Sequence, residues 1–148
     1  MKDRVILVTG SNEGIGYAIA KLCHQQGAKV VLHGLEQAAL KVSANSIGPD
    51  VKFVVADLKD RDAPGKIIEF VMAEHGRIDG LVNNAGMLDR STLETVSSEL
   101  TDLMFAVNFR APLMLTKAAV AEMKTQTTGG NIVNIGSINA GSGAPTLV

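Results

Sequence analysis

Residues 9–16 form a glycine-rich turn, and they read Thr9-Gly10-Ser11-Asn12-Glu13-Gly14-Ile15-Gly16. The turn follows a short β-branched run, Val5–Thr9, and opens a segment, Gly14–Gln26, whose apolar residues recur at helical spacing. A strand, a glycine-rich turn and a helix in this order are the context in which proteins bind the diphosphate of a dinucleotide. The first turn of such a helix offers free backbone N–H groups and a positive dipole end to a phosphate.

The three glycines of this turn have the spacing GxxxGxG, which differs from the commoner GxGxxG. We expect Gly10 to permit the tight turn, Gly14 to let the backbone approach a diphosphate, and Gly16 to let the helix pack closely on the strand. No Lys-Ser/Thr pair follows Gly16, so the turn is not a mononucleotide loop of the Walker type. A glycine-rich connection without a ligand is the alternative interpretation.

The rest of the chain alternates strand and helix patterns. Further strand candidates are Lys29–His33, Val51–Ala56, Ile78–Asn83 and Asn131–Gly136, and further helix candidates are Glu36–Asn45, Pro64–Glu74 and a long segment from Ser97 to about Thr125. Pro112 inside the long segment predicts a kink or a loosened turn. Alternating strands and helices predict a parallel sheet, and continuous apolar strands predict helices on both of its faces. We therefore expect one α/β domain over residues 1–148, a doubly wound parallel sheet of about five strands.

Composition excludes several classes of function. The chain has 14 Lys and Arg against 15 Asp and Glu, without a basic tract, and 3% aromatic residues, so no nucleic-acid partner is expected. One cysteine, Cys23, excludes a disulfide framework and favours a reducing, cytoplasmic setting. His24, His33 and His75 lack the spacing of metal ligands, so we interpret them as surface or packing residues and expect no metal. No apolar run approaches the roughly 18–20 residues of a membrane span.

Four further motifs follow the glycine-rich turn in a fixed order. They are Asp57 after the third strand, Asn83-Asn84-Ala85-Gly86 after the fourth, Asn108 in the long helix and Ser137 after the fifth strand. Together these motifs resemble the short-chain dehydrogenase/reductase family over essentially the whole chain, above all its 3-oxoacyl carrier-protein reductase-like and hydroxysteroid dehydrogenase-like members. The resemblance implies a Rossmann-like sheet in the order 3-2-1-4-5. It also implies an oxidoreductase that transfers hydride between a nicotinamide cofactor, NAD or NADP, and a small-molecule carbonyl or alcohol.

The resemblance also assigns cofactor-binding residues. The diphosphate and the adenosine ribose would be lined by Gly10, Ser11, Gly14, Ile15 and Gly16. Asp57 would accept a hydrogen bond from the adenine amino group, with the backbone of Leu58 beside it. Asn83, Ala85 and Gly86 would line the cofactor cleft. The alternatives are that Asp57 caps the segment that follows it and that Asn83 and Asn84 are turn residues.

Two residues are catalytic candidates by the same resemblance. Ser137 would hydrogen-bond the substrate oxygen, and Asn108 would bend the long helix and hold a water in a proton relay. Each has a plainer reading, as a serine that caps a turn and as a hydrogen-bonded helix asparagine. The family's acid/base is the tyrosine of a Tyr-x-x-x-Lys motif about a dozen residues after the serine, which would lie beyond Val148. The one tyrosine of the chain, Tyr17, lies in the first helix and cannot replace it.

We therefore expect the chain to be the amino-terminal part of a short-chain dehydrogenase, truncated before the later strands and inactive alone. The alternative is a module or remnant that binds a nucleotide without redox chemistry. In either case the open edge of the last strand and the uncovered helix 97–125 predict self-association into a homo-oligomer. We also expect a mobile tail at residues 142–148.

The sequence favours NAD over NADP. Family members that prefer NADP carry a basic residue just before the second glycine of the loop, where this chain has Glu13. They also tend to have an arginine one place beyond the second-strand glycine, where this chain has Leu35. A negative Glu13 would repel a 2′-phosphate. The aspartate typical of NAD enzymes is replaced by Gly34, and Glu36 is the residue that could reach the ribose instead.

Overall fold

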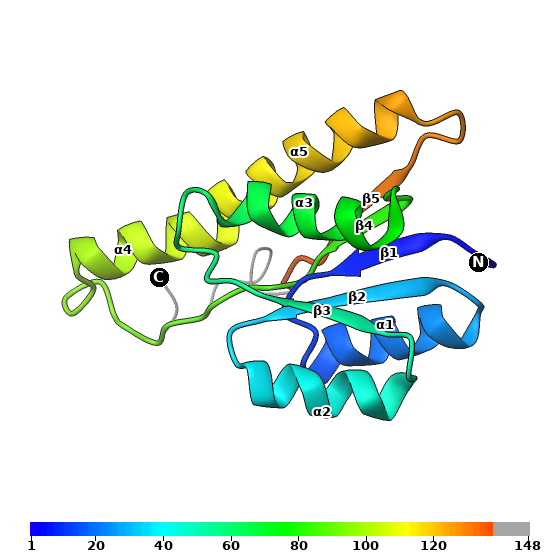
Figure 1. Cartoon of the computed structure of the whole chain (residues 1–148). Coiled ribbons are helices and arrows are strands. Elements are labelled where there is room, and N and C mark those ends of the chain that lie inside the picture. Colours follow the sequence, from blue (N-terminus) through cyan, green and yellow to red (C-terminus); the bar gives the residue numbers. More distant parts are fainter. Residues whose placement is uncertain (138–148) are drawn as a thin grey trace.

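Five parallel strands form one sheet at the centre of the computed structural model, which describes residues 1–137 (Figure 1). The strands are β1 Val5–Val8, β2 Lys29–Gly34, β3 Lys52–Val55, β4 Gly80–Asn83 and β5 Asn131–Asn134. Their order is β3-β2-β1-β4-β5, and every neighbouring pair is parallel, which confirms the predicted fold. The tail expected to be mobile, residues 142–148, lies outside the described residues.

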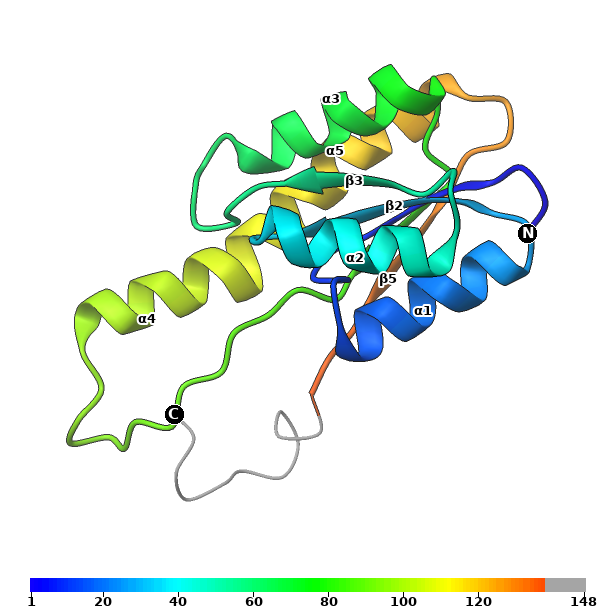
Figure 2. The ribbon, with the colours of Figure 1, turned by 60° about the horizontal axis from the view of Figure 1, so that its bottom comes forward.

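Helices cover both faces of the sheet, as the continuous apolar strands predicted (Figures 1 and 2). The helices are α1 Gly14–Gln25 and α2 Gln37–Ile47 on one face, and α3 Ala63–His75 and α5 Ala111–Thr125 on the other. The helix α4, Ser98–Phe105, extends beyond the sheet and buries none of its residues. Alternate residues of β1 enter two separate cores. Leu7 packs into the core on the α3 and α5 side, and Val8 packs into the core on the α1 and α2 side.

The strand β4 begins two residues later than the pattern predicted, at Gly80 rather than at Ile78. The side chain of Gln126 explains the difference. Its Oε1 accepts from the Ile78 N–H at 2.9 Å, and its Nε2 donates to the Ile78 carbonyl at 3.0 Å. Because both backbone groups of Ile78 are bonded to this amide, they do not enter the sheet ladder.

The predicted long helix is continuous from Ser98 to Thr125, with the π-helical turn η1, Ala106–Arg110, between α4 and α5. Ser97 caps it, because its Oγ accepts from the Leu100 N–H at 3.2 Å. Pro112 lies in the first turn of α5 and has no N–H to donate to the carbonyl four residues earlier, at Asn108. The wider π turn is the loosened turn that the proline predicted.

By length and composition, the helix Ser98–Thr125 could cross a membrane, so the expectation that no stretch qualifies is wrong on these criteria. This is weak evidence, since core helices of globular proteins meet the same criteria. In α5, the residues Leu115, Ala119 and Met123 are buried in the core beside α3. Only 22% of the apolar window is buried, however, so most of this surface is uncovered within the described part of the chain.

Candidate functional site

The glycine-rich turn lies at the carboxyl end of β1 and leads directly into α1. Gly10 and Gly14 have φ values of 59° and 60°, in the left-handed region that favours glycine. A Cβ on Gly10 would lie 2.8 Å from the Ala85 Cα, whereas one on Gly14 would meet nothing within 4 Å. Gly10 therefore permits close packing of two loops, and Gly14 faces open space at the start of α1.

Gly16 lets α1 begin close to the residues that follow β1. A Cβ on Gly16 would collide with the Gly10 carbonyl oxygen and would lie 2.5 Å from the Asn84 Nδ2. That amide donates to the carbonyls of Thr9 and Gly10 at 2.9 and 2.8 Å. Gly16 thus leaves room for the amide that joins the turn to the β4 loop.

The second asparagine of the Asn-Asn-Ala-Gly motif lines the pocket, whereas the first faces the helix layer. The side chain of Asn83 is buried, and its Nδ2 donates to Thr116 Oγ1 and Asn134 Oδ1 at 3.2 and 2.9 Å. Asn84 and Ala85 both donate backbone N–H groups to Thr9 Oγ1 at 3.0 Å. The sequence reading placed Asn83, and not Asn84, among the cofactor residues.

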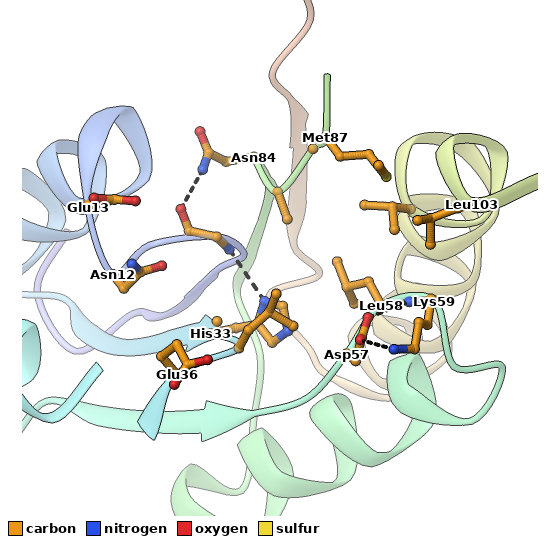
Figure 3. A pocket seen from close by; sticks show the side chains of 16 residues that line it. Asn12, Glu13, His33, Glu36, Asp57, Leu58, Lys59, Asn84, Met87 and Leu103 are labelled. Atoms are coloured by element: carbon orange, nitrogen blue, oxygen red, sulfur yellow. Dashed lines mark hydrogen bonds and ion pairs between the residues drawn. The ribbon is translucent and has the colours of Figure 1, made fainter. Parts of the chain in front are cut away.

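His33 connects three strand ends below the turn, a role that the sequence did not reveal. The side chain of His33 is buried, its Nδ1 accepts from the Gly10 N–H at 3.3 Å, and its Nε2 donates to the Ala56 carbonyl at 3.1 Å (Figure 3). Burial lowers the pKa of His33 to about 4, although the Ala56 hydrogen bond and nearby Asp57 act in the opposite direction. The imidazole is therefore neutral at pH 7, and its only ring proton is on Nε2.

Ser11 is buried against the strands. Its Oγ donates to the Val8 carbonyl at 2.7 Å and accepts from the His33 N–H at 3.1 Å. Ile15, in contrast, is 65% exposed on the first turn of α1. The backbone N–H of Ser11 also donates to the His33 carbonyl, at 2.9 Å, so both the hydroxyl and the N–H of Ser11 hold the turn on the sheet.

Asp57 and Lys59 form an ion pair on the opposite wall of the pocket (Figure 3). Asp57 Oδ1 accepts from the Lys59 N–H at 3.0 Å, and Oδ2 lies 2.8 Å from Lys59 Nζ. These hydrogen bonds lower the pKa of Asp57, so the carboxylate is ionised at neutral pH. Asp57 therefore caps the next residues, as the plainer reading proposed, while it also lines the pocket.

These elements enclose a cavity of about 670 Å³ at the carboxyl edge of the sheet. Its walls come from the turn, the ends of β2, β3 and β4, and the helix α4 with η1. Figure 3 labels ten of the residues that line it: Asn12, Glu13, His33, Glu36, Asp57, Leu58, Lys59, Asn84, Met87 and Leu103. A volume in this range fits a nucleotide-sized ligand. Within residues 1–137, no group of three or more His, Cys, Asp or Glu side chains could hold a metal ion.

The two catalytic candidates lie near this edge. Asn108, in η1, accepts from the Met87 N–H and donates to the Met87 carbonyl, both at 2.8 Å. The amide of Asn108 thus holds the loop after β4. Ser137 is exposed and follows β5, which pairs with β4. Parallel pairing therefore puts the residues after both strands at the same edge of the sheet.

A parallel sheet in this order, with helices on both faces and a glycine-rich turn after its first strand, defines a Rossmann-like fold. The family profile "short chain dehydrogenase" matches residues 4–148. The chain belongs to the short-chain dehydrogenase family, as the order of its motifs suggested.

Relatives and solved structures agree with this assignment. The chain is 38% identical to the short chain dehydrogenase adrF of Penicillium roqueforti, over 100% of this chain and 57% of that protein. A metagenomic short-chain oxidoreductase in complex with NADP is similar with a TM-score of 0.87 and 35% identity, over 93% of this chain and 63% of that one. The 3-ketoacyl-(acyl-carrier-protein) reductase of Brucella melitensis, complexed with NADH, has a TM-score of 0.91 and 30% identity, over 99% and 62%. The chain thus spans less than two thirds of the length of these proteins.

Proposed function

We propose that this chain is the cofactor-binding part of an oxidoreductase that transfers hydride between NAD and a small-molecule carbonyl or alcohol. The observation that carries the proposal is the pocket lined by Gly10, Gly34 and Gly86. Gly14, which follows the pocket residue Glu13, leaves open space at the first turn of α1. Gly10, Gly14 and the amino end of α1 would hold the diphosphate, and Asp57 with the Leu58 backbone would hold the adenine. Bound NAD would supply the hydride acceptor or donor.

The charges of the pocket favour NAD over NADP. Glu13 and Glu36 both line the pocket. Of the pocket-lining side chains within residues 1–137, Lys59 is the one cation at pH 7, and its Nζ is paired with Asp57. His33 is neutral at this pH. A 2′-phosphate would thus enter a region of negative charge without an available counter-charge, which disfavours NADP.

We expect the purified chain to bind NAD about tenfold more tightly than NADP at low ionic strength. Isothermal titration calorimetry with both dinucleotides measures the two dissociation constants. The variants Glu13→Gln and Glu36→Gln should each tighten NADP binding more than NAD binding. Glu69→Gln removes an exposed carboxylate from α3 and is the matched control. An NADP affinity equal to that for NAD would contradict this preference, and no binding of either would contradict the proposed function.

The catalytic candidates of the chain are Ser137 and Asn108. Ser137 would orient the substrate oxygen, and Asn108 would act through the loop at Met87. The hydroxyl of the one tyrosine, Tyr17, hydrogen-bonds Ser46 at 3.0 Å on the α1 and α2 side of the sheet, so it is not available as the acid/base. We therefore propose that the 148-residue chain binds the cofactor but does not by itself catalyse a detectable reaction. NADH-linked reduction of a carbonyl panel by the 148-residue chain would refute that statement.

We also propose that the chain self-associates through the long helix. Phe105, Phe109 and Leu113 recur at four-residue spacing and are 58%, 54% and 50% exposed, and the two phenyl rings lie 4.8 Å apart. This spacing makes a continuous apolar stripe across α4, η1 and α5. We expect light scattering after size exclusion to give a dimer or larger species, and Leu113→Ser to shift it toward monomer. Leu22→Ser, at a 58% exposed leucine of α1, should not. A wild-type monomer at high concentration would exclude the proposal.

A further inference from the structure

Side chains from β2 and from η1 hold the two ends of residues 56–59. At the first end, His33 donates to the Ala56 carbonyl at 3.1 Å. At the other end, the guanidinium of Arg110 donates to the Lys59 carbonyl. Arg110 is the last residue of η1, whereas His33 lies in β2. The segment that carries Asp57 is therefore fixed between the sheet and the π turn.

Lys59 transmits this fixation to the carboxylate. Its backbone N–H and its ammonium group bind different oxygens of Asp57, at 3.0 and 2.8 Å. One residue thus determines both the position and the rotation of the carboxylate, while each oxygen keeps a lone pair for a ligand. The same contacts raise the pKa of Lys59 and lower that of Asp57, so both groups stay charged at neutral pH.

Asn108 gives the π turn a second contact, on the other side of the pocket. The side-chain amide of Asn108 binds both the N–H and the carbonyl of Met87. Arg110, two residues further along the same turn, binds the Lys59 carbonyl. The turn therefore joins the loop after β3 to the loop after β4. Val107, from the same turn, lines the pocket between them.

As an exposed ion pair, Lys59 and Asp57 would contribute little to stability. The main effect of the pair is therefore to orient the carboxylate of Asp57.

We propose that Arg110 and Lys59 are positioning residues that aim the Asp57 carboxylate at the C6 substituent of the purine and so select adenine over hypoxanthine. The inference rests on the proposed function, in which Asp57 reads the adenine. A fixed carboxylate accepts from a 6-amino group and repels a 6-carbonyl oxygen. When the carboxylate can rotate, ordering it on binding weakens the attraction, and moving it aside relieves the repulsion.

The test compares NAD with nicotinamide hypoxanthine dinucleotide, which differs from NAD at C6 of the purine. Calorimetric titration of the full chain with each gives a selectivity ratio. We expect wild type to favour NAD about tenfold or more, a ratio typical of one hydrogen bond that reads a ligand group. Arg110→Met and Lys59→Met should each reduce the ratio about fivefold, mostly through weaker NAD binding. Arg110→Lys, which can still donate to the Lys59 carbonyl, should restore part of it.

Arg61→Met is the charge-matched control, because Arg61 is an exposed arginine in the same connection between β3 and α3. It should leave the ratio unchanged. If Arg110→Met and Lys59→Met weaken both dinucleotides equally, or leave the ratio at the wild-type value, the positioning role is wrong although the proposed function stands. If wild type binds neither dinucleotide, the proposed function fails and the inference fails with it. Because Lys59 is exposed, we expect Lys59→Met to fold even if Arg110→Met does not, so the proposal can still be tested with Lys59→Met.

Discussion

Gly16→Ala should weaken NAD binding about tenfold or more and lower the free energy of unfolding by about 1–3 kcal/mol, the usual cost of overpacking. The added methyl group would collide with the Gly10 carbonyl and lie 2.5 Å from the Asn84 amide. Neither neighbour can yield freely. The carbonyl belongs to the turn that would face the diphosphate, and the amide is bonded to both Thr9 and Gly10. The turn and the β4 loop must therefore separate to admit the methyl group.

Gly65→Ala is the matched control for Gly16→Ala. Gly65 also lies near the start of a helix, α3, and a Cβ there would meet nothing within 4 Å. Alanine should stabilise that helix by up to about 1 kcal/mol, since it restricts the unfolded chain more than glycine does. Urea denaturation and calorimetric titration with NAD measure the two effects. Wild-type affinity in Gly16→Ala would show that the turn is more deformable than its hydrogen bonds indicate.

The sheet topology could be predicted from the sequence because its signals are local. Apolar runs such as Val30 to Leu32 are buried on both faces, and each is followed by a helical pattern of its own. The positive φ of Gly10 and Gly14 follows equally well from their place between a strand and a helix. The motif order then identified the family without any knowledge of side-chain contacts.

The side-chain partners could not be predicted, because they depend on contacts between strands that are distant in sequence. Asn83 and Asn84 are equivalent in the sequence, but the alternation of the strand end turns the side chain of Asn83 toward Thr116 and that of Asn84 toward the Thr9 carbonyl. The hydrogen bond from the Lys59 N–H to Asp57 is local in sequence, and the alternative that Asp57 caps the following segment had included such a contact. Arg110 could not be linked to Lys59 without knowing how the π turn packs beside β3.

His33 shows the same limit. A histidine at the end of an apolar strand carries no local signal that distinguishes packing from a bridge to Gly10 and Ala56. The sequence reading as a surface or packing residue was therefore incomplete. The buried imidazole makes a pH-dependent contribution to stability, because a protonated Nδ1 cannot accept the hydrogen bond from the Gly10 N–H.

We expect His33 to make the free energy of unfolding fall by about 3 kcal/mol as the pH is lowered from 7 to 4, at 1.36 kcal/mol for each unit of pKa shift. Its pKa is 6.5 in the unfolded chain and about 4 in the folded one. Between these values the unfolded state binds more protons, so stability is fully present above pH 6.5 and is lost as the pH falls toward 4. Protonation would also place an N–H on Nδ1 against the Gly10 N–H, so the NAD affinity of the folded protein should fall only as the pH approaches 4.

His33→Gln tests this contribution, because its amide does not titrate and can still donate to the Ala56 carbonyl. Urea denaturation from pH 7.5 to 4.5 should give a flatter stability profile for the variant than for wild type. His75, whose pKa is also lowered by burial, remains in both proteins. Asp79 acts only at lower pH: burial raises its pKa, but hydrogen bonds from Arg77, Val5 and Arg4 bring it to about 2. An equal slope in His33→Gln would show that the imidazole of His33 is not the group that titrates.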